Sequence, residues 1–160
     1  MKADLNEAIK AKDETKSLVL RAVIASIQNK EKEKRYAESK KNPNASEADL
    51  EKSSFLSEEE LIDVFASEAK KRRESIVEFE KGKRNDLVQK EKKELEILQT
   101  YLPEQMPEEE LKKIVKEAIS KTGAQTMKDM GKVMAELMPK VKGRADGGLI
   151  SKIVKESLSC

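Results

Sequence analysis

The sequence predicts an all-α protein, with an N-terminal helical domain that contains antiparallel helix hairpins and a small C-terminal three-helix domain. Three observations predict this class. Apolar residues recur at spacings of three and four along most of the 160-residue chain, which is the period of an amphipathic helix. Charged residues make up 40% and hydrophobic residues 37% of the chain, as expected for exposed helices with narrow apolar stripes. Aromatic residues make up only 3%, which disfavours β-sheets.

The first helix is predicted from the apolar series that runs from Leu5 to Ile27 at helical spacing. The charged run 28–35 can extend this helix, but it lacks an apolar face, and its alternating charges support it only through neighbouring pairs. Residues 39–56 are interpreted as a connector that contains an Asn-Pro-Asn turn and a short helix capped by Ser46.

Two longer helices are predicted after the connector. Ser57 and Glu60 have the spacing of a capping box and begin the first of them, and Gly82 fits its end. The second helix runs from about Arg84 to Tyr101. Because the link between the two is short, the sequence predicts an antiparallel helix hairpin.

Pro103 and Pro107 predict the boundary between the two domains, because neither proline fits inside a helix. The predicted domains are therefore residues 1–102 and residues 107–160.

Three helices are predicted for the C-terminal domain. Pro107 begins the first and Gly123 ends it. Thr126 and Asp129 begin the second helix, which Pro139 is expected to end. The third helix follows a glycine-rich turn, so this domain is predicted to be a compact three-helix unit.

The residue types exclude most catalytic and metal chemistry. The chain has no histidine and a single cysteine, Cys160, so it lacks the usual general base, an internal disulfide and the ligands of a zinc site. No glycine-rich phosphate loop is present, and the many carboxylates are interpreted as solvated helix surface. The sequence therefore predicts a protein that is not an enzyme and binds no cofactor or metal.

The expected location follows from the absence of apolar segments. The chain begins with Met1 and Lys2 and then further charged residues, without an apolar signal segment. No run approaches 18 apolar residues, so no membrane span is predicted. We therefore expect a soluble, cytoplasmic protein that does not associate with membranes.

Charge is distributed unevenly along the chain. Residues 105–160 carry 11 Lys and Arg against 8 Asp and Glu, whereas residues 1–104 carry 22 against 23. The whole-chain net charge of +2 predicts no strong polyanion partner. The asymmetry nevertheless ranks the C-terminal part ahead of the N-terminal part as a site for an anionic ligand.

The segment 140–148 has two interpretations. As a binding site, Lys140, Lys142 and Arg144 neutralise phosphates, and Gly143 lets the backbone approach a ligand at a helix N-terminus. As a structural element, the segment is a tight turn in which Gly143 supplies a positive φ and Asp146 caps the last helix. On the residues alone the turn is favoured, since the charge of Asp146 opposes a nearby phosphate.

Several motifs resemble the YqeY-like proteins, and together they extend over essentially the whole chain. Residues 39–56 carry the least of this resemblance. The motifs are Leu18-Val19-Leu20-Arg21, the stretch Glu68 to Phe79, Leu98-Gln99-Thr100-Tyr101-Leu102-Pro103-Glu104-Gln105-Met106, Met127-Lys128-Asp129-Met130-Gly131-Lys132-Val133-Met134, and Met138-Pro139-Lys140-Val141-Lys142-Gly143-Arg144-Ala145-Asp146-Gly147.

The resemblance implies a fold and suggests a partner. It implies an N-terminal helical domain and a small C-terminal helical domain, the second of which is similar to the tail of the B subunit of the tRNA-dependent Asp/Glu amidotransferase. In that enzyme the tail contacts tRNA. The enzyme's catalytic domains have no counterpart in this sequence, so its activity is not implied.

The leading hypothesis is a non-catalytic module that binds tRNA or another structured RNA through the phosphate backbone. Its candidate contacts are Lys128, Lys132, Lys140, Lys142, Gly143 and Arg144. One alternative is a protein-interaction adaptor with a protein partner in an apolar inter-domain groove, rimmed by Met127, Met130, Met134 and Met138. The other is an accessory protein of a carbon–nitrogen ligase (an amidotransferase) without an active site of its own.

Overall fold

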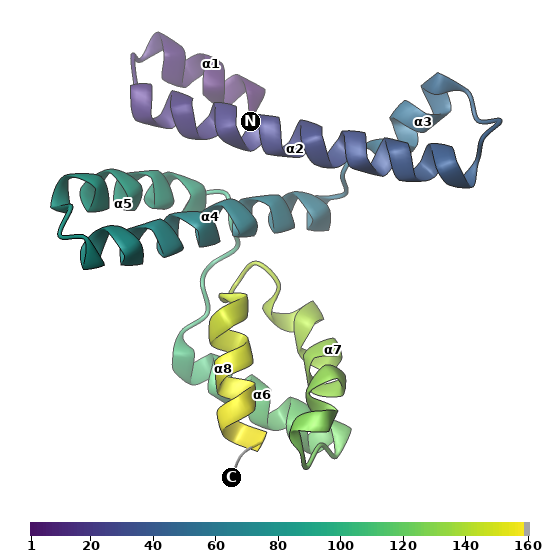
Figure 1. The fold of residues 1–160 in the computed structure, drawn as a ribbon, viewed down its shortest axis with the longest axis vertical. Coiled ribbons are helices and arrows are strands. Elements are labelled where there is room, and N and C mark those ends of the chain that lie inside the picture. The colour runs from purple at the N-terminus through teal and green to yellow at the C-terminus, as the bar shows by residue number, and fades with distance from the viewer. Residues whose placement is uncertain (159–160) are drawn as a thin grey trace. The chain divides into compact units, whose positions relative to one another are not determined.

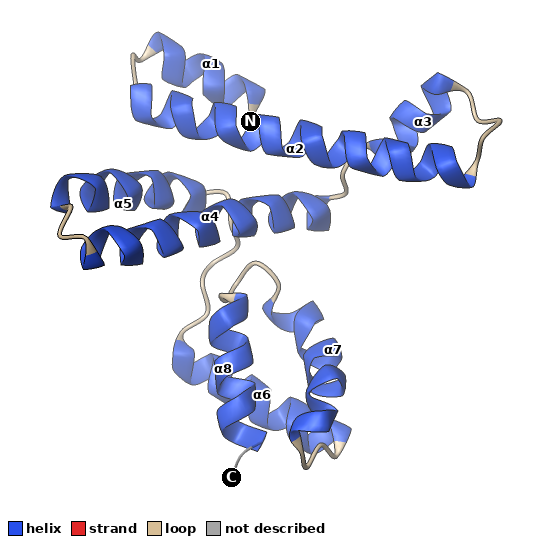
Figure 2. Cartoon of the chain, viewed as in Figure 1, coloured by secondary structure: helices blue, strands red, loops and turns tan. Residues whose placement is uncertain are grey.

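The computed structural model describes residues 1–158, so Cys160 lies outside the described part of the chain. Figure 2 shows helices joined by loops, and residues 1–158 contain no strand, which confirms the predicted all-α class. The chain divides into two compact units, Met1–Tyr101 (unit 1) and Leu102–Cys160 (unit 2). Within the described stretch, no helix combines the length and the apolar character needed to cross a membrane.

Unit 1 is built from helices that pack side by side as hairpins (Figure 1). The short α1 lies along the first part of α2, and α3 folds back along the last part. The pair α4 and α5 forms a second hairpin, and both of its helices contact α2. The helices are α1 (Lys2–Lys10), α2 (Glu14–Lys41), α3 (Glu47–Ser54), α4 (Glu58–Lys81) and α5 (Asn85–Gln99).

The first predicted helix is in fact two helices, so the expectation of one continuous element is wrong. The helix is interrupted at Lys12, which takes a left-handed φ of 56°. The Asp13 carboxylate then accepts a hydrogen bond from the backbone N–H of Lys16 at 2.9 Å and caps α2. The apolar series continues on both sides of this break, and α1 packs against α2 with Ala8 buried, whereas Ile9 and Leu18 stay exposed.

The charged extension of α2 continues as far as Lys41. Tertiary contacts support it in place of an apolar face. The Lys34 ammonium donates to the Glu60 carboxylate at 2.8 Å and to the Phe55 carbonyl at 3.1 Å. The short helix α3 within the predicted connector begins at Ser46, whose hydroxyl accepts from the Asp49 N–H, as expected.

The predicted hairpin after the connector is confirmed. Ser57 and Glu60 form the capping box, and α4 and α5 lie side by side (Figure 1). The link contains an unexpected detail. Gly82 has an ordinary φ of −77°, whereas the next residue, Lys83, takes the left-handed φ of 54°. The left-handed residue therefore follows the glycine by one position.

The end of α5 is tied to α1 and α4 through Tyr101. The Tyr101 ring stacks on Phe65 with ring centroids 5.1 Å apart. Its hydroxyl donates a 2.7 Å hydrogen bond to the Asp4 carboxylate. Burial of the phenol and its bond to Asp4 raise the pKa of Tyr101 to about 12. These contacts hold the first helix of unit 1, α1, beside Tyr101, which follows its last helix, α5.

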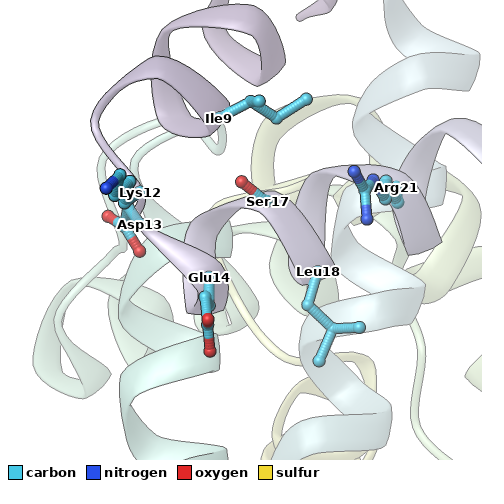
Figure 3. Close-up of a pocket in the computed structure, with 7 residues that line it drawn as sticks. All are labelled: Ile9, Lys12, Asp13, Glu14, Ser17, Leu18 and Arg21. Carbon is cyan, nitrogen blue, oxygen red and sulfur yellow. The ribbon is translucent and has the colours of Figure 1, made fainter.

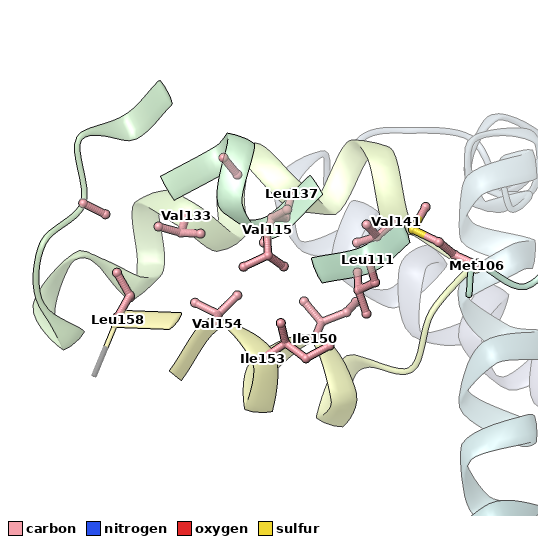
Figure 4. Close-up of a cluster of buried hydrophobic side chains, with 12 residues drawn as sticks. Met106, Leu111, Val115, Val133, Leu137, Val141, Ile150, Ile153, Val154 and Leu158 are labelled. Atoms are coloured by element: carbon pink, nitrogen blue, oxygen red, sulfur yellow. The ribbon is translucent and has the colours of Figure 1, made fainter. Parts of the chain in front are cut away.

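Unit 2 packs its helices around one apolar core, which Figure 4 shows. Gly123 ends α6 with a left-handed φ of 62°, as predicted. The capping box of Thr126 and Asp129 also forms, at a short 3₁₀ helix that leads into α7. The helices are α6 (Glu108–Thr122), η1 (Met127–Asp129), α7 (Met130–Val141) and α8 (Gly147–Leu158).

Pro139 does not end its helix, which contradicts the sequence prediction. It lies inside the last turn of α7, which continues to Val141. A proline there removes only one backbone donor, and the helix closes with a bond from the Lys142 N–H to the Met138 carbonyl. Burial of Val141 in the core favours this extension.

Candidate functional site

Three of the predicted contact residues lie on or beside α7. Lys128 is in η1, and Lys132 and Lys140 are in the first and last turns of α7. Residues four positions apart share one helix face, so Lys132, Glu136 and Lys140 form a row on α7, and Lys128 precedes it by the same spacing. We call Lys128, Lys132 and Lys140 the lysine row.

The ammonium groups around this row are more exposed than the carboxylates they contact. Lys132 lies 3.0 Å from Asp129, yet its side chain is 72% exposed and that of Asp129 only 25%. Lys121 lies 2.6 Å from Glu136, with exposed fractions of 68% and 25%. Lys140 reaches the same Glu136 at 3.8 Å.

The recessed carboxylates have local structural tasks. Asp129 accepts from the hydroxyl and N–H of Thr126 and from the Gln125 N–H. The hydrogen bond from Lys132 is the main cause that lowers the pKa of Asp129, and the bond from Lys121 is the main cause for Glu136. Both groups are therefore anionic at neutral pH, and an approaching ligand meets the lysines first.

The predicted turn interpretation of 140–148 agrees with the local geometry. Gly143 takes a left-handed φ of 72°. The Asp146 carboxylate accepts from the N–H groups of Gly148 at 2.8 Å and Leu149 at 3.2 Å. It thereby occupies the N-terminus of α8 with the chain's own negative charge, in the place where a phosphate would otherwise bind.

The same turn anchors the segment before α6. The Gln105 side-chain amide donates to the Gly143 carbonyl at 2.9 Å, and the Met106 N–H donates to the Arg144 carbonyl at 2.7 Å. The Arg144 guanidinium donates to the Glu104 carbonyl at 3.3 Å. We call this set of bonds the 104–144 latch. Two motifs of the sequence, 98–106 and 138–147, thus meet in unit 2.

The structure therefore separates the six candidate residues into two groups. Lys128, Lys132 and Lys140 present exposed ammonium groups along α7. Gly143 and Arg144 belong to the turn and to the 104–144 latch, where Arg144 also lies 3.6 Å from Glu110. Lys142 is half-buried beside them and has an interaction of its own. The latch joins residues about 40 positions apart, and no local signal in the sequence predicts it.

Two glutamates contradict the expectation that all acids are solvated surface, because Glu68 and Glu94 are buried in unit 1. Glu68 accepts a hydrogen bond from the Ser26 hydroxyl at 3.0 Å and pairs with Lys71 at 2.6 Å. Glu94 pairs with Arg72 at 2.9 Å. The Glu94–Arg72 pair joins α5 to α4, whereas Glu68 pairs with Lys71 on its own helix and reaches α2 through the hydrogen bond from Ser26. Both carboxylates are thus compensated, as in structural ion pairs.

Sequence reasoning also missed a hollow of about 530 Å³ between α6 and α8. Its lining combines the apolar Ile119 and Ile153 with Lys112 and Lys116. The core periodicity assigned both isoleucines to the interior and gave no sign of an opening between them. Among residues 1–158, no cluster of three or more acidic, cysteine or histidine side chains is placed to hold a metal ion.

Comparison with known proteins identifies relatives of the chain. A model of the family described as "Yqey-like protein" matches residues 1–158. A protein of Kluyveromyces lactis is 37% identical over 101 residues, which are 63% of this chain and 45% of that protein. A protein of Pyrenophora tritici-repentis is 29% identical over 159 residues, which are 98% of this chain and 77% of that protein. The chain thus spans a little under half of the Kluyveromyces relative.

Both relatives bear the name "Altered inheritance of mitochondria protein 41, mitochondrial". This name assigns both relatives to mitochondria, and it contradicts the expectation of a cytoplasmic protein. Neither it nor the family description denotes a catalytic activity. The family model covers nearly the whole chain and agrees with the resemblance carried by the motifs. The chain is therefore a member of the YqeY-like protein family.

Proposed function

We propose that this protein is a non-catalytic RNA-associated module, and that unit 2 binds the phosphate backbone through the lysine row. The observation that carries the proposal is the relative exposure of charges along α7. Lysine ammonium groups project outward, whereas Asp129 and Glu136 are recessed and occupied by caps and ion pairs. A polyanion therefore encounters positive charge first, although the unit carries both signs.

The spacing of the row suits an extended backbone. Lys132 and Lys140 are eight residues apart on α7, about 12 Å at the helical rise of 1.5 Å per residue. One strand of a nucleic-acid duplex presents a phosphate about every 3.4 Å along its axis. The row can thus contact several phosphates of one strand. The similarity of the C-terminal domain to a tRNA-contacting tail favours RNA as the polyanion.

The composition of unit 2 predicts the mode of recognition. Every aromatic residue of the chain precedes residue 102, so unit 2 has no ring on which a base can stack. We therefore expect recognition of backbone and shape, with little dependence on base sequence and a strong dependence on salt.

The test is a titration of full-length protein with tRNA at several salt concentrations. A triple variant, Lys128→Gln, Lys132→Gln and Lys140→Gln, should weaken binding and lower the slope of log affinity against log salt by about 2 to 3, since each lost phosphate contact contributes about 0.7 to 0.9. Its matched control replaces the exposed unit 1 lysines Lys10, Lys52 and Lys90 by glutamine.

The two triple variants have the same net charge, so they distinguish a located site from general attraction. Equal losses in both would show that binding follows net charge and would refute the lysine row as the site. No tRNA binding by the wild type at low salt would refute the function itself. Arg144→Gln serves as a third variant, and its effect should include loss of unit 2 stability through the 104–144 latch.

A further inference from the structure

An exposed hollow lies between α1 and α2 in unit 1. Its volume is about 550 Å³, and its lining includes Ile9 and Leu18. Both side chains are large and apolar, yet Ile9 is 46% and Leu18 51% exposed. Figure 3 shows Ile9 approaching from α1 and Leu18 projecting from α2. The rest of the lining is charged or polar and consists of Lys12, Asp13, Glu14, Ser17 and Arg21. Ile9 and Leu18 therefore form a small exposed apolar surface within a mostly polar hollow.

Charged residues flank this apolar surface in a particular order. Glu14, Leu18 and Arg21 all line the hollow and lie at positions i, i+4 and i+7 of α2, which places them within one face of the helix. Figure 3 shows Glu14 and Leu18 projecting to the same side of α2. Along α2 this face therefore presents a negative residue, an apolar residue and a positive residue in that order.

Neither flanking charge is neutralised within the described part of the chain. Glu14 and Arg21 are exposed, and no ion pair or hydrogen bond of their side chains occurs there. Asp13, by contrast, uses its carboxylate to cap α2. The Glu14 carboxylate and the Arg21 guanidinium are thus available to a partner, whereas the Asp13 carboxylate is committed to the fold.

This order of charges is self-complementary under two-fold symmetry. If two copies of α2 pack antiparallel about an axis between Ser17 and Leu18, each Glu14 faces the Arg21 of the other copy. The two Leu18 side chains then meet near the axis, because residue 18 is half a position from it. An isologous interface needs this property, in which one surface complements itself.

We infer that the face of Glu14, Leu18 and Arg21, together with Ile9, is a docking surface for a second copy of this chain, which forms an antiparallel dimer through α2. A stable interface buries roughly 1,200–2,000 Å² in total. One face of α2 together with Ile9 of α1 can bury an area in the lower part of that range at most. The dimer is therefore weak, and it forms only at high protein concentration.

The test is sedimentation equilibrium of the full chain, followed by interference optics because the protein has no tryptophan and two tyrosines. Wild type should dimerise in a concentration series up to about 500 µM, a range chosen for a weak interface. Glu14→Arg and Arg21→Glu should each raise the dimer dissociation constant about tenfold or more, because each places like charges in contact. Leu18→Gln should weaken the dimer as well.

Charge reversal also permits a rescue experiment. The double variant Glu14→Arg, Arg21→Glu restores both opposite-charge contacts and should dimerise like wild type. A mixture of the two single variants should form a heterodimer, because each of its two contacts again joins an arginine to a glutamate. Glu33→Arg is the matched control, since Glu33 is exposed on the same helix outside the face, and it should leave the dissociation constant unchanged.

Three results would overturn the inference: a wild-type monomer at every concentration, a dimer that tolerates both single reversals, or a mixture that yields no heterodimer. Circular dichroism of each variant checks folding, since arginine in the first turn of α2 opposes the helix dipole by a small amount. The heterodimer keeps the test valid even if one single variant is slightly less stable. If another surface joins the two copies, the double variant offers no rescue over either single one.

Discussion

The link between α4 and α5 places its glycine one residue before the position that needs it. Gly82 has φ −77°, which any residue adopts, and Lys83 has φ 54°, which favours glycine. A left-handed conformation costs an L-residue about 1–2 kcal/mol. We therefore predict that Lys83→Gly stabilises unit 1 by about 0.5–1 kcal/mol, after the added freedom of the unfolded chain is subtracted.

The complementary change concerns Gly82. A Cβ at this position would lie 3.5 Å from the Glu78 carbonyl oxygen and 3.7 Å from that of Phe79, which are ordinary contacts. Gly82→Ala should therefore stabilise the unit by about 0.4–1 kcal/mol, because the unfolded chain loses freedom. The double variant with Lys83→Gly should gain about 1–2 kcal/mol if the neighbouring changes are additive.

The assay is urea unfolding followed by tyrosine fluorescence. Both tyrosines, Tyr36 and Tyr101, lie in unit 1, so the signal reports that unit alone. Lys81→Gly is the control, because a glycine inside the last turn of α4 should destabilise by about 1 kcal/mol. If Lys83→Gly destabilises the unit as Lys81→Gly does, the assignment of strain to Lys83 is wrong.

Three further predictions concern the core and the ion pairs. Leu137→Ala should destabilise unit 2 by about 2–5 kcal/mol, since Leu137 is fully buried. Hydrogen exchange of the α6 and α8 amides measures this loss of stability, and unchanged protection would contradict the prediction. The hydrogen bond from Lys34 holds the pKa of Glu60 at about 2 instead of 4.5, so this carboxylate stabilises unit 1 above pH 4.5 and loses that effect as the pH falls toward 2. Glu60→Gln should flatten this part of a pH series of urea midpoints, and an unaltered profile would show that other groups cause it. Arg72→Ala should cost about 2–4 kcal/mol by leaving Glu94 buried without its partner, whereas replacing both residues by methionine should recover most of the loss in the same fluorescence assay.

Local signals predicted much of the fold. The capping box at Ser57, the left-handed Gly123 and the cap at Asp146 all depend on residues within four positions of one another, so short segments of sequence contain them. The break at Lys12 escaped prediction because apolar residues at helical spacing lie on both sides of it and neither glycine nor proline marks it. Pro139 was misassigned because burial of the residues after it outweighs the loss of one donor.

The candidate site was harder to predict, because its elements are far apart in the chain. Helical spacing places Lys132 and Lys140 on one face, but the ion pair of Glu136 with Lys121 joins two different helices. The role of Arg144 in the 104–144 latch depends on a carbonyl 40 positions away. Charge alone therefore identified the basic segment, and only the packed structure distinguishes its exposed lysines from its structural turn.

The 104–144 latch has a mechanical consequence. The chain enters unit 2 through residues 103–106, and the Met106–Arg144 and Gln105–Gly143 bonds lie directly on that path. Tension applied to the chain at residue 102 is therefore borne first by these bonds and reaches the first turn of α6 only after they break. The turn between α7 and α8 thus protects the beginning of α6 from unravelling under load.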